Sequence, residues 1–215
     1  MTKAVLFDLD GVLVSTDEYH YRSWVKIADQ EGFDFFDHKF NDKFRGVARM
    51  ECVEILTKAS GRVYSAEQKK EIAERKNRYF AESLSAVTPG ELLPGALSTL
   101  QELRKRGIKI AVASNSRNAK TIIRQTKIDH LLDTVVDGYE IENSKPDPEV
   151  FLLAAKNVGV DPAHCVVVED AVAGIEAARR AGMKALGIGT PERLPDADVV
   201  VPSLSAISID RLLNL

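Results

Sequence analysis

The chain has 215 residues, 45% of them apolar, and can bury a substantial core in one large domain or two modest ones. Its 29 basic and 32 acidic side chains give a formal net charge of −3, so no basic field favours binding to nucleic acid or to an anionic membrane. No apolar run approaches the roughly 20 residues of a membrane span, and we expect a cytoplasmic protein. Cys52 and Cys165 lie far apart in apolar segments and are expected to be buried free thiols.

The first apolar run ends in two aspartates. The run is AVLF, residues 4–7, and Asp8 and Asp10 follow it in FDLDGVLVST. Because strand side chains alternate between faces, we expect both carboxylates on one side, roughly 6.5–7 Å apart. An Asp-Gly turn that only solvates a loop is the alternative interpretation.

Six short apolar runs predict buried parallel strands, with helical stretches between most of them. Helical spacing of apolar residues is clear in 95–107, 147–159 and 171–182, each of which ends on a glycine. Alternating strands and helices with short loops predict an α/β fold: a doubly wound, Rossmann-like parallel sheet with helices on both faces. The expected strands are residues 3–10, 109–115, 133–138, 165–170, 184–189 and 198–202.

Residues 17–85 interrupt this alternation. They contain no convincing strand, and 17–32, 48–61 and 65–84 have the pattern of amphipathic helices. Ser65 and Gln68 form a capping-box pattern at the start of the third helix. The stretch VTPGELLPG that follows is rich in Pro and Gly, as a hinge would be. We therefore expect a helical insert after the first strand.

Polar side chains follow four of the predicted strands. These segments are Asp8 with Asp10, SNSRN at 114–118, Lys145 in SKPDP, and Glu169 with Asp170. The carboxyl ends of parallel strands face one way, so the segments should converge on one crevice. Carboxylates, a hydroxyl and an ammonium together suit phosphoryl transfer. Four carboxylates with one lysine also need a hard divalent cation, which favours Mg²⁺.

DLDGVLVST, SNS, SKPDP and VVVEDAVAGIEAARRAG are similar to the four motifs of the haloacid dehalogenase superfamily. The insert resembles the superfamily's type-one cap, which implies a catalytic core of residues 1–15 and 86–215 and a helical cap domain of residues 16–85. The resemblance implies that Asp8 is the nucleophile and forms an aspartyl phosphate, and that Asp10 is the general acid and base. Ser114 is expected to bond the transferring phosphoryl group, and Lys145 to pair with that group and with Asp8.

Glu169 and Asp170 end the most apolar strand and could serve as N-caps of the helix that follows. The resemblance implies a metal site instead. We expect Mg²⁺ to be bound by the carboxylates of Asp8 and Asp170 and by the main-chain carbonyl of Asp10. Glu169 is expected to bind it directly or through water.

His20 and Trp24 are four residues apart and share a helix face, a pattern typical of packing between helices. However, EYHYRSW, FRGVARME and AERKNRYF resemble the sugar-phosphate mutases of the superfamily. That resemblance implies that Trp24 faces the cleft and that His20 and Lys76 help to place Asp10 when the cap closes. It places Thr16 at the first hinge.

The same resemblance implies a second phosphate site. Arg49, which follows a Gly46 that allows close backbone approach, would bind the non-transferring phosphate of a doubly phosphorylated sugar. An exposed helix arginine is the alternative. The expected core residues of the substrate site are Asn115, Ser116, Arg117 and Asn118. The family commonly has lysine at position 117 and a small residue at 115, and arginine keeps the charge but changes the geometry.

The resemblance therefore implies a Mg²⁺-dependent phosphohexose mutase. It would interconvert β-D-glucose 1-phosphate and D-glucose 6-phosphate through an aspartyl phosphate and a bound β-glucose 1,6-bisphosphate. A sugar-phosphate phosphatase with the same core residues, in which water attacks the aspartyl phosphate, is the alternative. A non-catalytic regulatory module is a third interpretation, against which the intact set Asp8, Asp10, Lys145 and Asp170 argues. The expected partners are the hexose phosphate and the bisphosphate, with no nucleic acid and no membrane, and we expect a monomer.

Overall fold

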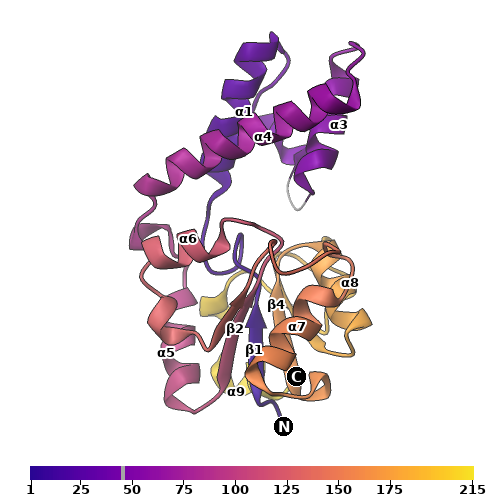
Figure 1. The fold of residues 1–215 in the computed structure, drawn as a ribbon. Helices are drawn as coiled ribbons and strands as arrows, with labels where there is room; N and C mark the ends of the chain where they lie inside the picture. The colour runs from indigo at the N-terminus through magenta and orange to yellow at the C-terminus, as the bar shows by residue number, and fades with distance from the viewer. Residues whose placement is uncertain (45–46) are drawn as a thin grey trace. The chain divides into compact units, whose positions relative to one another are not determined.

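The computed structural model describes residues 1–44 and 47–215. The chain divides into two compact units: Met1–Ser15 with Val87–Leu215, which we call the core unit, and Thr16–Ala86, which we call the cap unit. The division differs from the limits expected from the sequence only in the placement of Ala86. The core unit contains the sheet, and the described part of the cap unit is helical (Figure 1).

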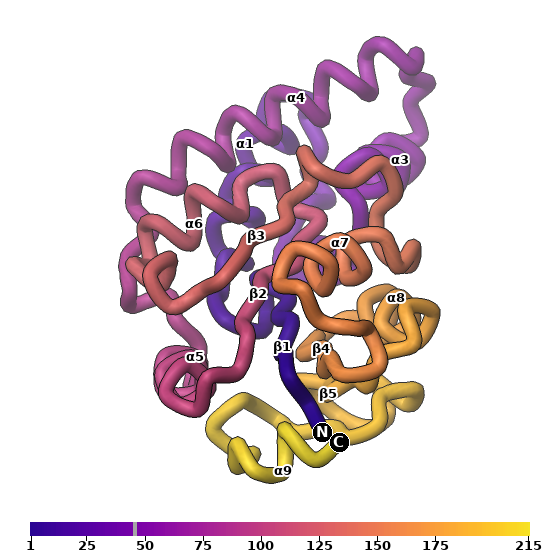
Figure 2. Tube along the Cα trace, turned by 60° about the horizontal axis from the view of Figure 1, so that its bottom comes forward, coloured from indigo at the N-terminus to yellow at the C-terminus, as the bar shows by residue number. Residues whose placement is uncertain are grey.

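The core unit is built on a parallel sheet with the strand order β3-β2-β1-β4-β5-β6. Strand β1 lies between β2 and β4 in the interior of the sheet (Figure 2). All six predicted strands are present, each shorter than its sequence range, and the predicted fold class is confirmed. The strands are β1 (Ala4–Phe7), β2 (Lys109–Ala113), β3 (Thr134–Val136), β4 (Cys165–Glu169), β5 (Lys184–Ile188) and β6 (Val199–Val201).

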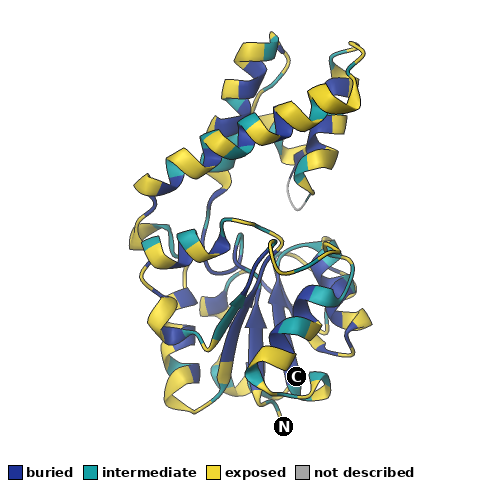
Figure 3. Cartoon of the chain, in the orientation of Figure 1, coloured by how far each residue is buried: buried dark blue, intermediate teal, exposed yellow. Residues whose placement is uncertain are grey.

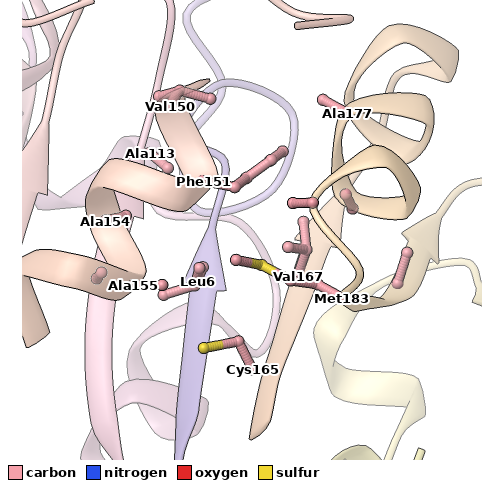
Figure 4. Close-up of a cluster of buried hydrophobic side chains, with 14 of the residues drawn as sticks. Leu6, Ala113, Val150, Phe151, Ala154, Ala155, Cys165, Val167, Ala177 and Met183 are labelled. Atoms are coloured by element: carbon pink, nitrogen blue, oxygen red, sulfur yellow. The ribbon is translucent and has the colours of Figure 1, made fainter. Parts of the chain in front are cut away.

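One face of the sheet is covered by α7 (Glu149–Val158) and α8 (Val172–Arg180). Leu6 of β1 and Val167 of β4 pack with Phe151 of α7 in a buried cluster (Figure 4). Each large side chain buried in this way contributes about 1.5–3 kcal/mol. The backbone pairing of β1 with β4 aligns Phe7 with Val168 at the carboxyl ends of the two strands.

Side chains alternate along a strand, so Val5 and Phe7 point away from that cluster, and both are fully buried. Helix α5 (Ala96–Lys105) packs against β2 and contacts α9 (Ile209–Leu213). Figure 3 shows the central strands as mostly buried, and every residue of β1 and β4 is buried. The remaining core elements are α6 (Ala119–Gln125) and the short 3₁₀ helices η3 (Pro89–Glu91), η4 (Asp129–Leu131), η5 (Pro162–His164) and η6 (Leu204–Ala206).

The cap unit contains the three helices predicted from the sequence. The predicted capping box is confirmed, because the Ser65 N–H donates to Gln68 Oε1 at 2.8 Å and the Gln68 N–H donates to Ser65 Oγ at 3.3 Å. Trp24, Leu56 and Ile72 are among the buried side chains that hold the helices together. The elements are α1 (Asp17–Glu31), α2 (His38–Asn41), η1 (Asp42–Phe44), α3 (Arg49–Ala59), α4 (Ala66–Ser83) and η2 (Leu84–Ala86).

Both cysteines are buried and free, as predicted. Burial raises the pKa of Cys52 to about 12 and the pKa of Cys165 to about 11. In the described residues, we find no helix with the length and apolarity that a membrane span requires.

Candidate functional site

Asp8 is the first residue beyond β1. Its N–H donates to the carbonyl of Val168 at 2.9 Å, so the pairing of β1 with β4 continues to this residue. The strand itself ends at Phe7, and the chain then turns, with the N–H of Val14 returning to the carbonyl of Leu9 at 3.1 Å. Strand β1 is therefore shorter than the sequence indicated, and the expectation that the Asp8 and Asp10 side chains project to one side stays a prediction.

The Lys145 ammonium lies at the centre of the core site. It donates to Asp8 Oδ1 at 2.6 Å, to Glu169 Oε1 at 2.7 Å and to the carbonyl oxygen of Ala113 at 3.0 Å. These bonds use all three ammonium hydrogens. The three side chains of the group are almost completely buried, with exposed fractions of 5% for Lys145, 13% for Asp8 and 2% for Glu169.

Burial and charge act in opposite directions on these groups. Burial raises the pKa of Asp8 well above its usual value, the Lys145 charge opposes that rise, and the Glu169 charge adds to it. Burial lowers the pKa of Lys145, but the carboxylates of Asp8 and Glu169 outweigh it and raise that pKa overall. Lys145 is therefore a permanent cation held against Asp8.

Both carboxylate oxygens of Glu169 accept hydrogen bonds. Oε1 accepts from Lys145, and Oε2 accepts from the N–H of Ala171 at 2.8 Å, at the start of α8. The sequence left open whether Glu169 caps this helix or binds a metal. Ala171 is the N-cap residue of α8 and no side chain of the described residues caps this helix, so the N-cap interpretation of Glu169 is wrong. Its two hydrogen bonds make Glu169 the side chain that fixes Lys145.

The loop after β2 is tied to its neighbours by short-range hydrogen bonds. Ser114 is 3% exposed, and its Oγ accepts the N–H of Ser116 at 3.1 Å. Ser116 Oγ accepts the N–H of Asn118 at 3.2 Å, and Asn115 Oδ1 accepts the backbone N–H of Lys145 at 3.3 Å. The loop that carries Ser114 is therefore fastened to the loop that carries Lys145.

Asp170 lies against the turn that follows Asp10. A methyl group added at Gly11 would overlap the Asp170 carboxylate, and the backbone there has φ +83°. Burial raises the pKa of Asp170 to about 7, the charges of Glu169 and Asp10 add to the rise, and Arg193, 3.6 Å away, opposes it. Nearby carboxylates therefore repel one another at this edge of the sheet.

The expected metal ligands are Asp8, Asp10, Glu169 and Asp170. Among the residues that the structure describes, no group of three or more His, Cys, Asp or Glu side chains is arranged to hold a metal ion. The donor chemistry still fits Mg²⁺, which takes oxygen ligands, retains several waters and needs only one or two protein carboxylates. Asp8 and Asp170 fit that description, and the mutual repulsion of the carboxylates favours a cation.

A second cationic group lies within the cap unit. Lys76 Nζ is 2.5 Å from His20 Nδ1, and the Lys76 side chain is almost fully buried, 4.7 Å above the Phe80 ring and 5.3 Å above the Trp24 ring. His20 stacks on Phe80 with ring centroids 3.9 Å apart. Burial lowers the pKa of His20, and the charges of Lys76 and Arg49 lower it further. His20 is therefore neutral beside two cations.

The other predicted cap residues occupy defined places, except one. Arg49 is the first residue of α3, and its side chain is partly buried. Thr16 is buried and directly precedes α1. Gly46 lies outside the described residues.

Three aromatic residues that lie against predicted site cations were not predicted from the sequence. Phe80 follows Lys76 by one helical turn, a spacing that could have indicated the contact. Phe151 lies under the Lys145 ammonium at 4.7 Å, and Tyr139 under the Arg117 guanidinium at 5.3 Å. Neither of these two contacts could be recognised from local sequence spacing, because the cation and the ring come from different elements.

The family of haloacid dehalogenase-like hydrolases matches residues 2–182. The chain belongs to the haloacid dehalogenase superfamily. Among similar proteins of that superfamily, the β-phosphoglucomutase of Bacillus subtilis (strain 168) is 41% identical over 212 residues, which cover 98% of this chain and 93% of that protein. The crystal structure of β-phosphoglucomutase from Clostridium difficile superposes with a TM-score of 0.90 at 36% identity, covering 100% of this chain and 96% of that one.

A phosphatase of the superfamily is also similar. The phosphorylated carbohydrates phosphatase of Thermotoga maritima is 30% identical over 218 residues, which cover 99% of this chain and 97% of that protein. The core site is thus compatible with either kind of enzyme. The choice between a mutase and a phosphatase rests on other features of this chain.

Proposed function

We propose that this enzyme interconverts β-D-glucose 1-phosphate and D-glucose 6-phosphate through an aspartyl phosphate at Asp8 and β-glucose 1,6-bisphosphate. The observation that carries the proposal is the second cationic group, in which Lys76 contacts His20 and the charge of Arg49 also lowers the pKa of that ring. A phosphatase needs one phosphate site, which Asp8 and Lys145 supply. A mutase that retains a bisphosphate needs a second one, and the similarity to β-phosphoglucomutases supports this choice.

In the proposed first step, an oxygen of Asp8 attacks the phosphorus of the substrate, and the bond from phosphorus to the sugar oxygen breaks. Lys145 holds Asp8 Oδ1 and places positive charge beside the phosphoryl oxygens. Ser114 contributes a buried hydroxyl from the loop after β2. The three donor bonds of Lys145 fix the ammonium before substrate arrives, so little reorganisation is needed during reaction.

Asp10 is proposed to give a proton to the departing sugar oxygen and to take one from the sugar hydroxyl in the reverse step. His20 and Lys76 are proposed to help place Asp10, with Trp24 beside the sugar and Thr16 at the hinge. Arg49 and Gly46 of the cap, and residues Asn115, Ser116, Arg117 and Asn118 of the core, are proposed to bind the substrate. These roles rest on the resemblance of the motifs to those of the mutases.

Mg²⁺ is the proposed cofactor. Asp8, Asp170 and the main-chain carbonyl of Asp10 would hold it, and Glu169 would act on it through water because both of its oxygens already accept hydrogen bonds. When bound, the ion supplies positive charge that lowers the pKa of Asp8 and offsets the charge of the phosphate. The protein's own part is to hold Asp8 in place through Lys145.

The deciding experiment supplies β-glucose 1-phosphate with a trace of β-glucose 1,6-bisphosphate and Mg²⁺, and measures glucose 6-phosphate and inorganic phosphate together. A mutase converts the substrate to glucose 6-phosphate with little release of phosphate. Release of phosphate in step with substrate loss would reject the proposal in favour of the phosphatase, which the similarity to the Thermotoga maritima enzyme supports. The Asp8→Asn variant serves as the blank for contaminating activity.

A further inference from the structure

Tyr139 is an exposed aromatic residue in the loop after β3. Its exposed fraction is 72%, so the ring contributes little to the core of the protein. The Arg117 guanidinium lies over this ring, with the central carbon 5.3 Å from the ring centroid. Arg117 belongs to the loop after β2, which also carries Ser114.

The backbone beneath the ring is firmly held. The N–H of Tyr139 donates to Asp137 Oδ1 at 2.9 Å, and Asp137 is 3% exposed. Glu140 accepts a hydrogen bond from Lys120 at 2.8 Å. These hydrogen bonds fix the backbone position of Tyr139, although its ring is exposed to solvent.

The two loops are also in direct backbone contact. The N–H of Gly138 donates to the carbonyl of Ser116 at 3.2 Å. A methyl group at Gly138 would overlap the carbonyl oxygen of Asn115, so the approach requires glycine at this position. The backbone segments that carry Tyr139 and Arg117 are therefore held next to each other, which brings the guanidinium over the ring.

Stacking of this kind suits an arginine that binds phosphate. A ring that lies against the face of a planar guanidinium leaves the N–H groups along the edge of the guanidinium available for two parallel bonds to phosphate oxygens. The ring also reduces the number of conformations that the long side chain explores, so less entropy is lost when the phosphate binds. A lysine at position 117 would not gain the same orientation.

We propose that Tyr139 is a positioning residue that holds Arg117 for bidentate binding of the phosphate that is not being transferred. The inference rests on the proposed function, since it assigns Arg117 to the second phosphate of the bisphosphate. It gives the arginine at this position a structural partner from the neighbouring loop. Tyr139 itself does not touch the reacting atoms.

The test compares Tyr139→Leu, which removes the ring, with Tyr139→Phe, which keeps it. An exposed stacking contact of this kind contributes the equivalent of about two- to fivefold in binding. Tyr139→Leu should raise the Kd for β-glucose 1,6-bisphosphate and the KM of the isomerase reaction by about that factor, while kcat stays near the wild-type value. Phosphorylation of Asp8 by acetyl phosphate, which has no second phosphate, should keep its rate, and Tyr139→Phe should match the wild type in every assay.

A third variant separates positioning from general stability. In the Arg117→Ala background, Tyr139→Leu should have no further effect on bisphosphate binding, because the group that it positions is gone. Equal bisphosphate affinity in Tyr139→Leu and wild type would overturn the inference, as would additive effects of the two substitutions or a parallel loss of the acetyl phosphate reaction. If the wild-type enzyme releases phosphate and does not isomerise, the proposed function fails first, and that result is visible before any variant is made.

Discussion

Lys145 donates to Glu169 Oε1 at 2.7 Å, and both side chains are at least 95% buried. The same ammonium reaches Asp8, so Glu169 positions the proposed nucleophile through Lys145. A buried ion pair of this kind contributes little net stability relative to an apolar pair. Removal of one partner is nevertheless destabilising, because the desolvation cost of the remaining buried charge is then less well compensated.

Lys145 keeps its bonds to Asp8 and Ala113 in Glu169→Ala, so we expect this change to lower the free energy of unfolding by about 1.5–3 kcal/mol, the contribution of one charge-assisted hydrogen bond. It should also slow phosphorylation of Asp8 at least about tenfold, because Lys145 loses one of its anchors. Urea denaturation measures the first effect, and the rate of phosphoenzyme formation from acetyl phosphate, followed by intact-protein mass spectrometry, measures the second.

Glu149→Ala is the matched control for Glu169→Ala. Glu149 is a carboxylate that accepts backbone N–H groups of Glu142 and Asn143, at 2.9 Å and 2.8 Å, away from Asp8. Its loss should cost less than about 1 kcal/mol and leave phosphorylation unchanged. A Glu169→Ala protein as stable and as active as this control would show that Glu169 does not hold Lys145.

The variants Asp8→Asn and Asp10→Asn should distinguish the proposed nucleophile, Asp8, from the proposed general acid, Asp10. Asp8→Asn removes the attacking oxygen, so neither sugar phosphates nor acetyl phosphate should yield a phosphoenzyme. Asp10→Asn should still be phosphorylated by acetyl phosphate, whose leaving group needs no proton, but should lose isomerase activity by about 100-fold or more.

The Asp8→Asn protein should remain folded. Burial disfavours the ionised Asp8 carboxylate, and Lys145 keeps its bonds to Glu169 and Ala113. Thermal unfolding should therefore show a Tm at or above that of the wild type. Phosphoenzyme formation in Asp8→Asn would refute covalent catalysis at this residue, and a failure of Asp10→Asn with acetyl phosphate would refute the division of roles.

Asp170 predicts a pH dependence of stability in protein freed of divalent cations. Its pKa is about 7 in the folded chain and has the ordinary value of 3.8 as reference for the unfolded chain. Between these two values Asp170 is protonated to a greater extent in the folded chain than in the unfolded chain, so the free energy of unfolding falls as pH rises. Above about pH 7 the full cost of ionising the buried carboxyl is present.

Thermal unfolding across that range, compared between wild type and Asp170→Asn, measures this contribution. The wild type should lose more Tm with rising pH than the variant, whose residue 170 does not titrate. Above pH 7, Mg²⁺ should raise the Tm of the wild type, by the equivalent of about 1.4 kcal/mol for each tenfold excess over its Kd, and should raise that of the variant less. Identical pH profiles for the two proteins would remove Asp170 from the electrostatic account of the site.

The sequence predicted the elements of the sheet better than their ends. Apolar runs identify strands because buried parallel strands are apolar on both faces. Strand β1, however, ends at Phe7, and after one more backbone bond, from Asp8 to Val168, the chain turns back on Leu9. That turn depends on backbone hydrogen bonds which composition does not encode, so the prediction of a longer strand through Asp10 was wrong.

The candidate site shows a similar division. The motifs indicated Asp8 and Lys145, since charged residues at strand ends are unusual enough to stand out. The bond between Lys145 and Glu169 could not be predicted, because each residue had other possible partners. Stacking of Arg117 on Tyr139 was not predictable either, as it depends on how closely the loops after β2 and β3 approach.

Arg49 supplies the sharpest test of the mutase interpretation, because its proposed partner is the phosphate that is not transferred. Arg49 lies at the start of α3, and its charge contributes to the lowered pKa of His20. A charge-assisted hydrogen bond contributes about 1.5–3 kcal/mol, so Arg49→Ala should weaken bisphosphate binding by about 10–100-fold. Phosphorylation of Asp8 by acetyl phosphate should keep its rate, since that donor has no second phosphate.

Arg22→Ala is the control in the same unit, since Arg22 is an exposed arginine that pairs with Glu18 along α1. It should leave both reactions unchanged, because surface ion pairs of this kind contribute little. If Arg49→Ala slows isomerisation and acetyl phosphate phosphorylation equally, Arg49 supports the fold or the core chemistry and does not bind the second phosphate. If Arg49→Ala slows neither reaction, Arg49 does not bind a second phosphate, and the phosphatase becomes the better interpretation of the same core residues.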